Sequence, residues 1–201
     1  MKKIILASKS IDRSEIFKRA GIPFEAFVTN INEEKFKTKF SNAVELVKEL
    51  AKTKMLFTQN ELEKKKIDAI IIAADTVVVL KGEIIGKAYN EEEAFKILKK
   101  LVGESHKLIT GIAITEIQNP KIIIESDTTI VEFLHLSDEE IWQYIKSNEW
   151  KGRAGAYSIR DKASLFIRKI NGSSSNVIGL PMHKLYEILK TEFGLNLIQF
   201  K

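Results

Sequence analysis

The chain has 201 residues, of which 44% are hydrophobic and 29% charged, enough for one substantial core or two small lobes sharing a cleft. It has no cysteine, which excludes disulfides, thiol catalysis and cysteine-bound metals and leads us to expect a cytoplasmic protein. No apolar run approaches a membrane span, and the apolar N-terminal stretch is too short for a signal peptide, so no membrane association is expected.

The net charge of +5 suits an anionic partner, and nucleic acids and nucleotides both qualify. The basic residues are spread along the chain, and the densest run, at residues 64–66, is typical of a solvated loop or helix end. Composition alone therefore does not choose between these partners.

The first half of the chain predicts four elements. Residues 2–7 form a strand and residues 12–20 a helix, which Ser10 caps and Gly21 ends. Residues 43–57 form a second helix, opened by Ser41 and Asn42, and residues 68–80 form a buried strand. A hairpin turn through residues 81–83 follows this strand.

The second half predicts three helices and four strands. Helices are expected at residues 91–101, 138–147 and 182–191, the first two opened by capping boxes at Asn90 and Ser137. Strands are expected at residues 107–117, 121–133, 163–170 and 196–200. This order predicts one α/β domain over residues 1–201, with a central mixed sheet flanked by helices, and a distinct lobe in the β-rich middle is the alternative.

Asp75 stands in the middle of the otherwise apolar run of residues 70–79. A carboxylate in such surroundings is costly to desolvate unless a metal, a cation or hydrogen bonds hold it. Lys87 follows the hairpin, so an acid and a lysine flank one turn and indicate a site for a phosphorylated, metal-bound ligand. The alternative is that Asp75 ends the strand and makes a turn.

The turn of residues 6–13, where a strand runs into a helix, is a second candidate site. The helix amides, the hydroxyls of Ser8 and Ser10 and the guanidinium of Arg13 would suit phosphate oxygens. The alternative is that Ser10 only caps the helix and that Arg13 is a surface residue.

Three further segments carry weaker signals. Glu33 and Glu34 could join Asp75 in binding Mg²⁺, which takes one or two carboxylates together with substrate phosphates. Arg153 lies between two glycines, which would let the backbone approach a ligand or would simply make a flexible connection. The polar residues 172–176 could cradle an anion or form a turn, and no segment matches a Walker or GxGxxG loop.

The three histidines, His106, His135 and His183, are isolated in the sequence. They lack the paired spacing that a zinc site would need. Each is therefore expected at the surface or at an interface.

Taken together, these segments resemble the Maf family of septum-formation-inhibitor-like nucleotide pyrophosphatases. The matching pieces extend over the whole chain: residues 5–8 with Ser10 and Arg13, Glu33, residues 50–51 with Lys54, residues 74–78, Gly86-Lys87, His106 with Thr110-Gly111, residues 154–157 and residues 175–181.

The resemblance implies a fold like that of inosine triphosphate pyrophosphatases, with two lobes around a cleft. It implies hydrolysis of a nucleoside triphosphate to the monophosphate and pyrophosphate, with a divalent metal cation, Mg²⁺ or Mn²⁺, usually in a homodimer. The family is also associated with restraint of cell division and with clearing non-standard nucleotides.

The resemblance also implies roles for individual residues. Asp75 would be the general base or would hold the metal that activates the water, and both roles stay open. Lys87 would act with Asp75 at the catalytic centre, and Glu33 would help to hold the metal. The triphosphate would be bound by Ser8, Ser10, Arg13, Lys54, Lys87, Arg153 and Arg160.

Three positions depart from the family pattern. Asp12 stands where a second basic residue is common, and Arg153 stands where lysine is frequent. Arg160 stands where one subgroup has a glutamine, which can both donate to and accept from a uracil or thymine edge, whereas arginine only donates. We therefore expect a weakened preference for dTTP and UTP.

Two alternatives belong to other functional classes. A nucleotide-binding regulator of cell division without turnover would not need Asp75, Lys87 and Glu33 together. A nucleic-acid-binding protein is suggested only by the charge of +5, and the sequence has no recognisable nucleic-acid motif, so no nucleic-acid partner is expected.

Overall fold

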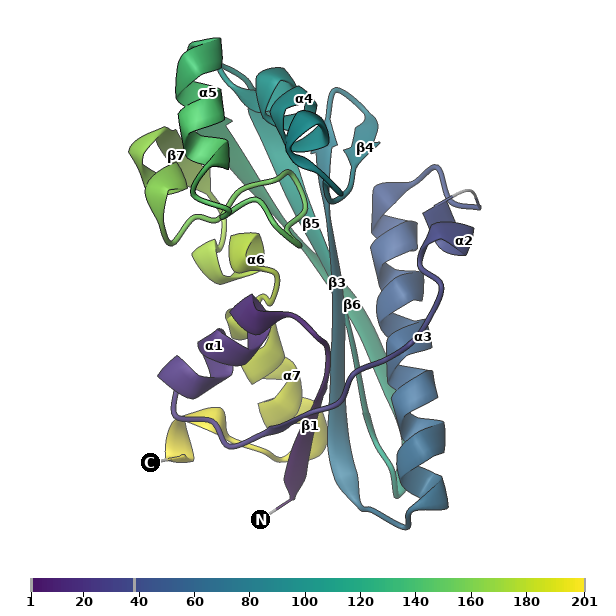
Figure 1. The fold of residues 1–201 in the computed structure, drawn as a ribbon. Coiled ribbons are helices and arrows are strands. Elements are labelled where there is room, and N and C mark those ends of the chain that lie inside the picture. The colour runs from purple at the N-terminus through teal and green to yellow at the C-terminus, as the bar shows by residue number, and fades with distance from the viewer. Residues whose placement is uncertain (1, 38, 201) are drawn as a thin grey trace. The chain divides into compact units, whose positions relative to one another are not determined.

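The computed structural model describes residues 2–37 and 39–200, which form a mixed sheet with helices beside it (Figure 1). The chain divides into two compact units. The first comprises the described residues up to Asp75, Thr110–Asp127 and the residues from Gly179 onward, and the second comprises Thr76–Ile109 and Thr128–Ile178. Strands β3 (Ala69–Leu80), β5 (Ser105–Glu116) and β6 (Asn119–Phe133) contribute residues to both units.

The sheet has the hydrogen-bonded order β2-β1-β3-β5-β6-β7, with β4 paired to β3 off this path. β1 (Lys3–Ala7) runs parallel to β2 (Glu25–Ala26) and to β3. β4 (Glu83–Ile85) runs antiparallel to β3, and β7 (Ile167–Asn171) runs antiparallel to β6. The sheet is therefore mixed, and the α/β fold class predicted from the sequence is confirmed.

In the first unit, helices lie on both faces of the strands. α3 (Ala43–Lys64) covers one face, and α1 (Ile11–Arg19) and α7 (Met182–Phe193) cover the other (Figure 1). Burial on both faces explains why β3 is apolar at every position except Asp75 and Thr76. The apolar cluster that α3 forms with the strands contains Ile5, Ala7, Ala51, Met55, Leu62, Ala69, Ile71, Ala73 and Ala113.

Gly111 of β5 allows α3 to approach the sheet closely. A Cβ atom at this position would lie 2.4 Å from the backbone carbonyl carbon and oxygen of Val47 and 2.7 Å from the backbone nitrogen of Lys48. Backbone atoms of a long helix cannot turn aside as a side chain can, so only glycine fits without displacing α3. The position of α3 matters because this helix carries Lys54.

In the second unit, α4 (Glu91–Leu101) and α5 (Asp138–Ile145) pack together, and Phe95 stacks on Trp142 with ring centroids 4.8 Å apart. His106, near the start of β5, belongs to the same unit's aromatic core. It is 1% exposed, and its Nε2 lies 2.9 Å from the hydroxyl oxygen of Tyr157. The expectation of a surface or interface position for His106 is wrong, because the alternation of β5 turns its side chain inward.

Several element boundaries differ from the predicted ones. α3 continues past residue 57 to Lys64, and residues 163–170 divide into a 3-10 helix η1 (Lys162–Leu165) and β7. The predicted C-terminal strand is wrong, because a 3-10 helix η2 (Leu197–Gln199) forms there with Asn196 as its cap. β2, α2 (Glu34–Lys37) and α6 (Ser174–Ile178) are too short for a periodic pattern to predict them. No helix in the described part of the chain is long and apolar enough to cross a membrane.

Candidate active site

Asp75 lies inside β3 and is 7% exposed. The strand continues to Leu80, so the alternative of an aspartate that ends the strand is wrong. The Oδ1 atom of Asp75 accepts a hydrogen bond of 2.5 Å from Nζ of Lys54. This buried cation offsets much of the cost of removing the carboxylate from water.

Lys54 links Asp75 to a second acid. Its Nζ lies 2.8 Å from Oε1 of Glu33, in the segment just before α2, and Lys54 itself is buried. One ammonium is thus shared by two carboxylates from segments far apart in the sequence. The structure describes the backbone of Glu34 but not its side chain, so the suggested role of Glu34 stays a prediction.

The turn between β1 and α1 is organised by two serines. Ser10 caps α1, with its side-chain oxygen accepting from the backbone N–H of Arg13 at 3.4 Å. The Ser8 hydroxyl oxygen accepts from the backbone N–H of Ser10 at 3.1 Å and from Nη1 of Arg13 at 3.3 Å. The predicted cap is therefore confirmed, and Ser8, Ser10 and Arg13 come together at the start of the helix.

Arg13 is buried rather than at the surface, so that alternative is wrong. Its Nε donates a hydrogen bond of 2.6 Å to the backbone oxygen of Gly179. The sequence gives no direct sign of this contact, although Gly179 lies in one of the family-like segments. Its φ of +106° is a backbone conformation that favours glycine.

The acids and Arg13 also interact electrostatically. Burial lowers the pKa of the Arg13 guanidinium from its ordinary value, while the charges of Asp75, Glu33 and Asp12 act to raise it. The first unit thus gathers two cations and two carboxylates in a largely buried place. Such cations suit phosphate oxygens, and such carboxylates suit a hard metal ion or the activation of water.

The other predicted residues belong to the second unit. Lys87 is exposed, and its backbone forms an isolated antiparallel bridge with Ala154. Gly155 donates a backbone hydrogen bond of 3.0 Å to Gly86, so the Lys87 segment lies beside the loop that carries Arg153. Arg153 is half-buried and donates from Nη1 to the backbone oxygen of Glu149 at 2.5 Å.

Arg160 is half-buried in the same loop region of the second unit. Its backbone N–H donates to the Ser158 hydroxyl oxygen at 3.4 Å, and that hydroxyl donates to Oδ2 of Asp161 at 3.3 Å. These bonds fix the backbone from which the Arg160 side chain extends.

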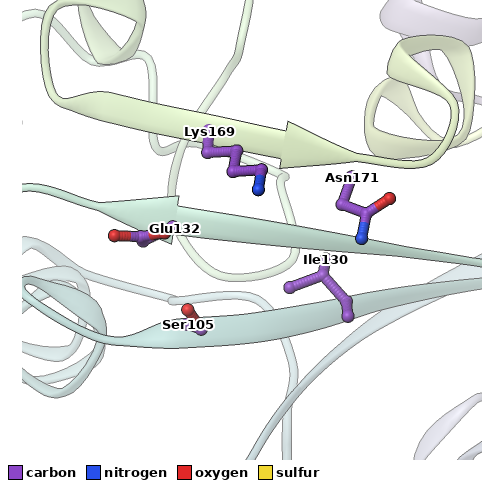
Figure 2. A pocket seen from close by; sticks show the side chains of 5 residues that line it. All are labelled: Ser105, Ile130, Glu132, Lys169 and Asn171. Carbon is purple, nitrogen blue, oxygen red and sulfur yellow. The ribbon is translucent and has the colours of Figure 1, made fainter.

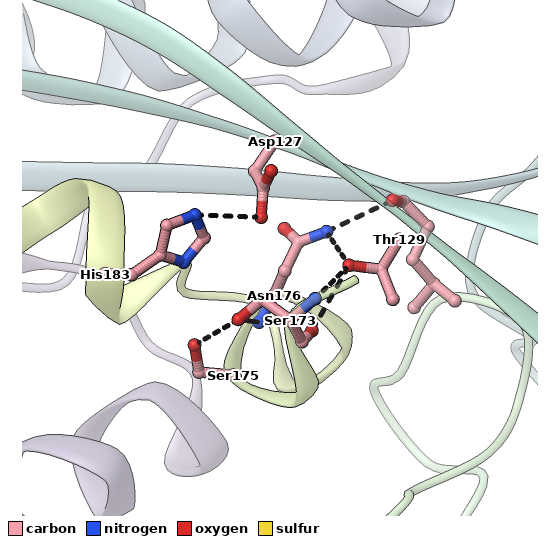
Figure 3. Close-up of polar contacts among 7 residues, drawn as sticks. Asp127, Thr129, Ser173, Ser175, Asn176 and His183 are labelled. Atoms are coloured by element: carbon pink, nitrogen blue, oxygen red, sulfur yellow. Dashed lines mark hydrogen bonds and ion pairs between the residues drawn. The ribbon is translucent and has the colours of Figure 1, made fainter. Parts of the chain in front are cut away.

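The serine-rich segment turns into α6 at Ser174, and its own hydroxyl groups hold this turn (Figure 3). The Ser173 hydroxyl lies 2.8 Å from that of Ser175 and accepts from the backbone N–H of Asn176 at 3.3 Å. The buried Asn176 amide donates to the Thr129 hydroxyl oxygen at 3.0 Å and to the Leu108 carbonyl at 3.3 Å. The structure therefore favours the turn over an anion cradle.

The two remaining histidines are exposed, as the sequence predicts. In the first unit, Nε2 of His183 lies 3.9 Å from Oδ2 of Asp127 (Figure 3).

A pocket in the second unit is lined by Ser105, Ile130, Glu132, Lys169 and Asn171 (Figure 2). None of the predicted site residues lines this pocket.

Glu33 and Asp75 fit a hard divalent cation. No group of three or more histidine, cysteine or acidic side chains within residues 2–37 and 39–200 could hold a metal alone. Mg²⁺ needs no such group, because one or two carboxylates with substrate phosphates and water complete its shell. Both carboxylates already meet one cation, the Lys54 ammonium, so their placement suits positive charge.

Comparison with known families and proteins gives consistent matches over nearly the whole chain. A family model described as "Maf-like protein" matches residues 3–192. The dTTP/UTP pyrophosphatase of Alkaliphilus oremlandii is 44% identical over 198 residues, covering 98% of this chain and 100% of that protein. The dTTP/UTP pyrophosphatase of Caldicellulosiruptor bescii is 39% identical over 199 residues, covering 99% of this chain and 98% of that protein.

Among solved structures, a nucleoside-triphosphatase/dITP/XTP pyrophosphatase of Mycobacterium abscessus is matched with a TM-score of 0.35 and 8% identity, over 65% of this chain and 72% of that chain. The fold class is given by the sheet and helices of this chain itself.

Proposed function

The chain belongs to the Maf-like family, and on this premise we propose that it is a nucleoside triphosphate pyrophosphatase. It would hydrolyse a nucleoside or deoxynucleoside triphosphate between the α and β phosphates. The observation that carries the proposal is the buried contact of Lys54 with Asp75 and Glu33, close to Arg13. The relatives named dTTP/UTP pyrophosphatase support the same reaction.

The reaction sets clear requirements for the site. A water oxygen attacks the α phosphorus, and the bond from that phosphorus to the oxygen bridging to the β phosphate breaks. The products are a nucleoside monophosphate and pyrophosphate. The attacking water must lose a proton, and the growing negative charge on the phosphate oxygens must be stabilised.

Asp75 is suited to activating the attacking water, because its carboxylate is buried and held in place by Lys54. One role for it is general base, accepting the water's proton. The other is ligand to Mg²⁺ or Mn²⁺, together with Glu33. Such an ion, when bound, supplies charge neutralisation and makes a bound water more acidic.

The basic residues and the α1 amides are suited to the triphosphate. Ser8, Ser10 and Arg13 stand where the N-terminus of α1 favours negative charge. Lys54 adds a movable positive charge. The resemblance implies the same role for Lys87 and Arg153, which lie in neighbouring segments of the second unit.

Product analysis with Mg²⁺ or Mn²⁺ and a panel of standard and modified nucleoside triphosphates tests the proposal. We expect monophosphate and pyrophosphate from the unmodified protein. The Asp75→Asn variant keeps the shape of the side chain but loses its charge, and we expect its rate to fall at least about a hundredfold. Asp68→Asn is a matched control, because Asp68 is exposed just before β3.

The products distinguish the alternatives. Nucleoside diphosphate and phosphate would identify a different phosphohydrolase. Tight nucleotide binding without turnover would favour the regulator of cell division. The relatives are named as pyrophosphatases, which does not favour this alternative. Equal rates for Asp75→Asn and Asp68→Asn would contradict the role of Asp75.

The proposal also includes a homodimer in the cytoplasm that has no nucleic-acid partner. The resemblance supports the dimer, and the lack of cysteine supports the cytoplasmic location. The lack of a nucleic-acid motif supports the absence of a nucleic-acid partner. Light scattering on the purified chain would measure the oligomeric state, and a monomer at micromolar concentration would contradict the dimer.

A further inference from the structure

One lysine contacts both acids of the proposed metal site. The Lys54 ammonium lies within 2.8 Å of Glu33 and 2.5 Å of Asp75. The side chains of Lys54 and Asp75 are buried, while that of Glu33 is 30% exposed. Both contacts join an ammonium to a carboxylate and are therefore charge-assisted hydrogen bonds, which are stronger than neutral ones.

Of the two cations at the candidate site, Lys54 is better able to move than Arg13. A lysine ammonium is a compact charge on a flexible four-carbon stem, whereas an arginine is a planar fork. Arg13 is held at Nε by the Gly179 carbonyl and at Nη1 by the Ser8 hydroxyl. Among the described residues, the Lys54 ammonium forms ionic hydrogen bonds only to Glu33 and Asp75, groups that a divalent cation would itself attract.

We propose that Lys54 is a reversible counter-ion that holds Glu33 and Asp75 in the nucleotide-free protein and passes to the triphosphate when a divalent cation takes its place. This inference rests on the proposed function, because it assumes that a triphosphate binds beside these acids. An ammonium between two carboxylates opposes the entry of a second cation. Its departure alone would remove a close positive charge from two carboxylates, at least one of them buried.

The consequence is positive coupling between the metal and the nucleotide. The triphosphate draws the ammonium away and so exposes two carboxylates to the metal, while the metal frees the ammonium for the phosphates. Coupling between two ligands is reciprocal, so each should tighten the binding of the other by the same factor. We expect a factor of about ten, within the usual range for coupled sites.

Mn²⁺ binding to the purified full chain, followed by electron paramagnetic resonance, tests this proposal without relying on turnover. In the absence of nucleotide, Lys54→Met should bind Mn²⁺ at least about fivefold more tightly than the unmodified protein, because the competing charge is gone. Lys54→Arg keeps the charge and should remain near the unmodified value. Lys52→Met removes a half-buried lysine of the same helix and is the matched control.

The coupling itself is measured with α,β-methylene analogues of UTP and GTP, which lack the bond that would be cleaved. The analogues should tighten Mn²⁺ binding to the unmodified protein about tenfold, after correction for Mn²⁺ held by the analogue in solution. The gain should be much smaller in Lys54→Met. Absence of this gain in the unmodified protein would overturn the inference even if Lys54→Met does not fold.

Equal Mn²⁺ affinity of the unmodified and Lys54→Met proteins, or Mn²⁺ binding that the analogues leave unchanged, would overturn the inference. Its failure differs from failure of the proposed function. Turnover to monophosphate and pyrophosphate without coupling would leave the pyrophosphatase standing and remove only the counter-ion role. Coupling that is lost in Lys54→Met, without turnover, would support the counter-ion role and contradict the pyrophosphatase.

Discussion

At the scale of single residues, Arg13 serves both the local structure and the candidate site. Its backbone N–H completes the Ser10 cap, and its guanidinium donates to Ser8 and to Gly179. Burial of a guanidinium is costly. The two hydrogen bonds and the negative charges of the nearby acids together offset part of that cost. The charge that would meet a phosphate is therefore oriented before the ligand arrives.

Arg160 is the residue on which we base a prediction about the nucleobase. Glutamine can donate to and accept from a uracil or thymine edge, whereas arginine only donates. We expect Arg160→Gln to raise the ratio of kcat/KM for UTP to that for GTP by about threefold to tenfold. This factor corresponds to the net free energy of roughly one hydrogen bond. Steady-state kinetics with both substrates measures this ratio.

A matched control for this prediction is Arg168→Gln. Arg168 is exposed on β7 and pairs with Glu132 at 3.1 Å, so its loss should leave the ratio unchanged. If the unmodified protein already prefers UTP as strongly as relatives that have the glutamine, then the proposed effect of Arg160 is wrong.

At the scale of elements, Gly111 sets the distance between α3 and the sheet. In Gly111→Ala the new Cβ would overlap the backbone of Val47, and α3 would have to shift. We expect a loss of about 1–3 kcal/mol in the free energy of unfolding, as for other overpacked cores. Chemical denaturation measures this loss.

The same substitution should also affect catalysis, because α3 carries Lys54 and the contacts of Lys54 are short. We expect kcat to fall in Gly111→Ala at temperatures where the variant remains folded. A variant with unchanged stability and unchanged kcat would show that α3 can adjust without cost.

At the scale of the whole molecule, the buried His106 links stability to pH. Burial lowers the pKa of His106 from 6.5 to about 4. Between these pH values the unfolded chain binds a proton at His106 that the folded chain does not. The contribution of the neutral His106 to the free energy of unfolding is therefore complete above about pH 6.5 and falls as the pH drops toward 4. At about 1.4 kcal/mol per pH unit, the total loss from His106 is about 3 kcal/mol.

The expected outcome is that His106→Gln loses this part of the pH dependence. Urea unfolding at pH 7 and at pH 4.5 would give the difference in free energy for each protein. The difference should be smaller in His106→Gln than in the unmodified protein and unchanged in His135→Gln, which removes an exposed histidine. Equal pH dependence in all three proteins would mean that the His106 imidazole is not kept neutral by burial.

The sequence by itself determined the main elements and the residue types of the site. Strong periodic patterns and capping residues predict α1, α4, α5 and α7, and the apolar run with its single acid predicts both β3 and a role for Asp75. These features are local, because a cap or a buried run depends on residues close together in the chain. Short elements such as β2 and α6 carry too few residues to show a period.

Only the tertiary structure decided which residues meet. Lys54 and Asp75 are far apart in the chain, and nothing in either segment states that the ammonium will lie between Asp75 and Glu33. The bond from Arg13 to the Gly179 carbonyl and the inward position of His106 were likewise decided by packing. The physical reason is that contacts between distant segments depend on how helices and strands pack, whereas a sequence pattern records only which face of each element is apolar.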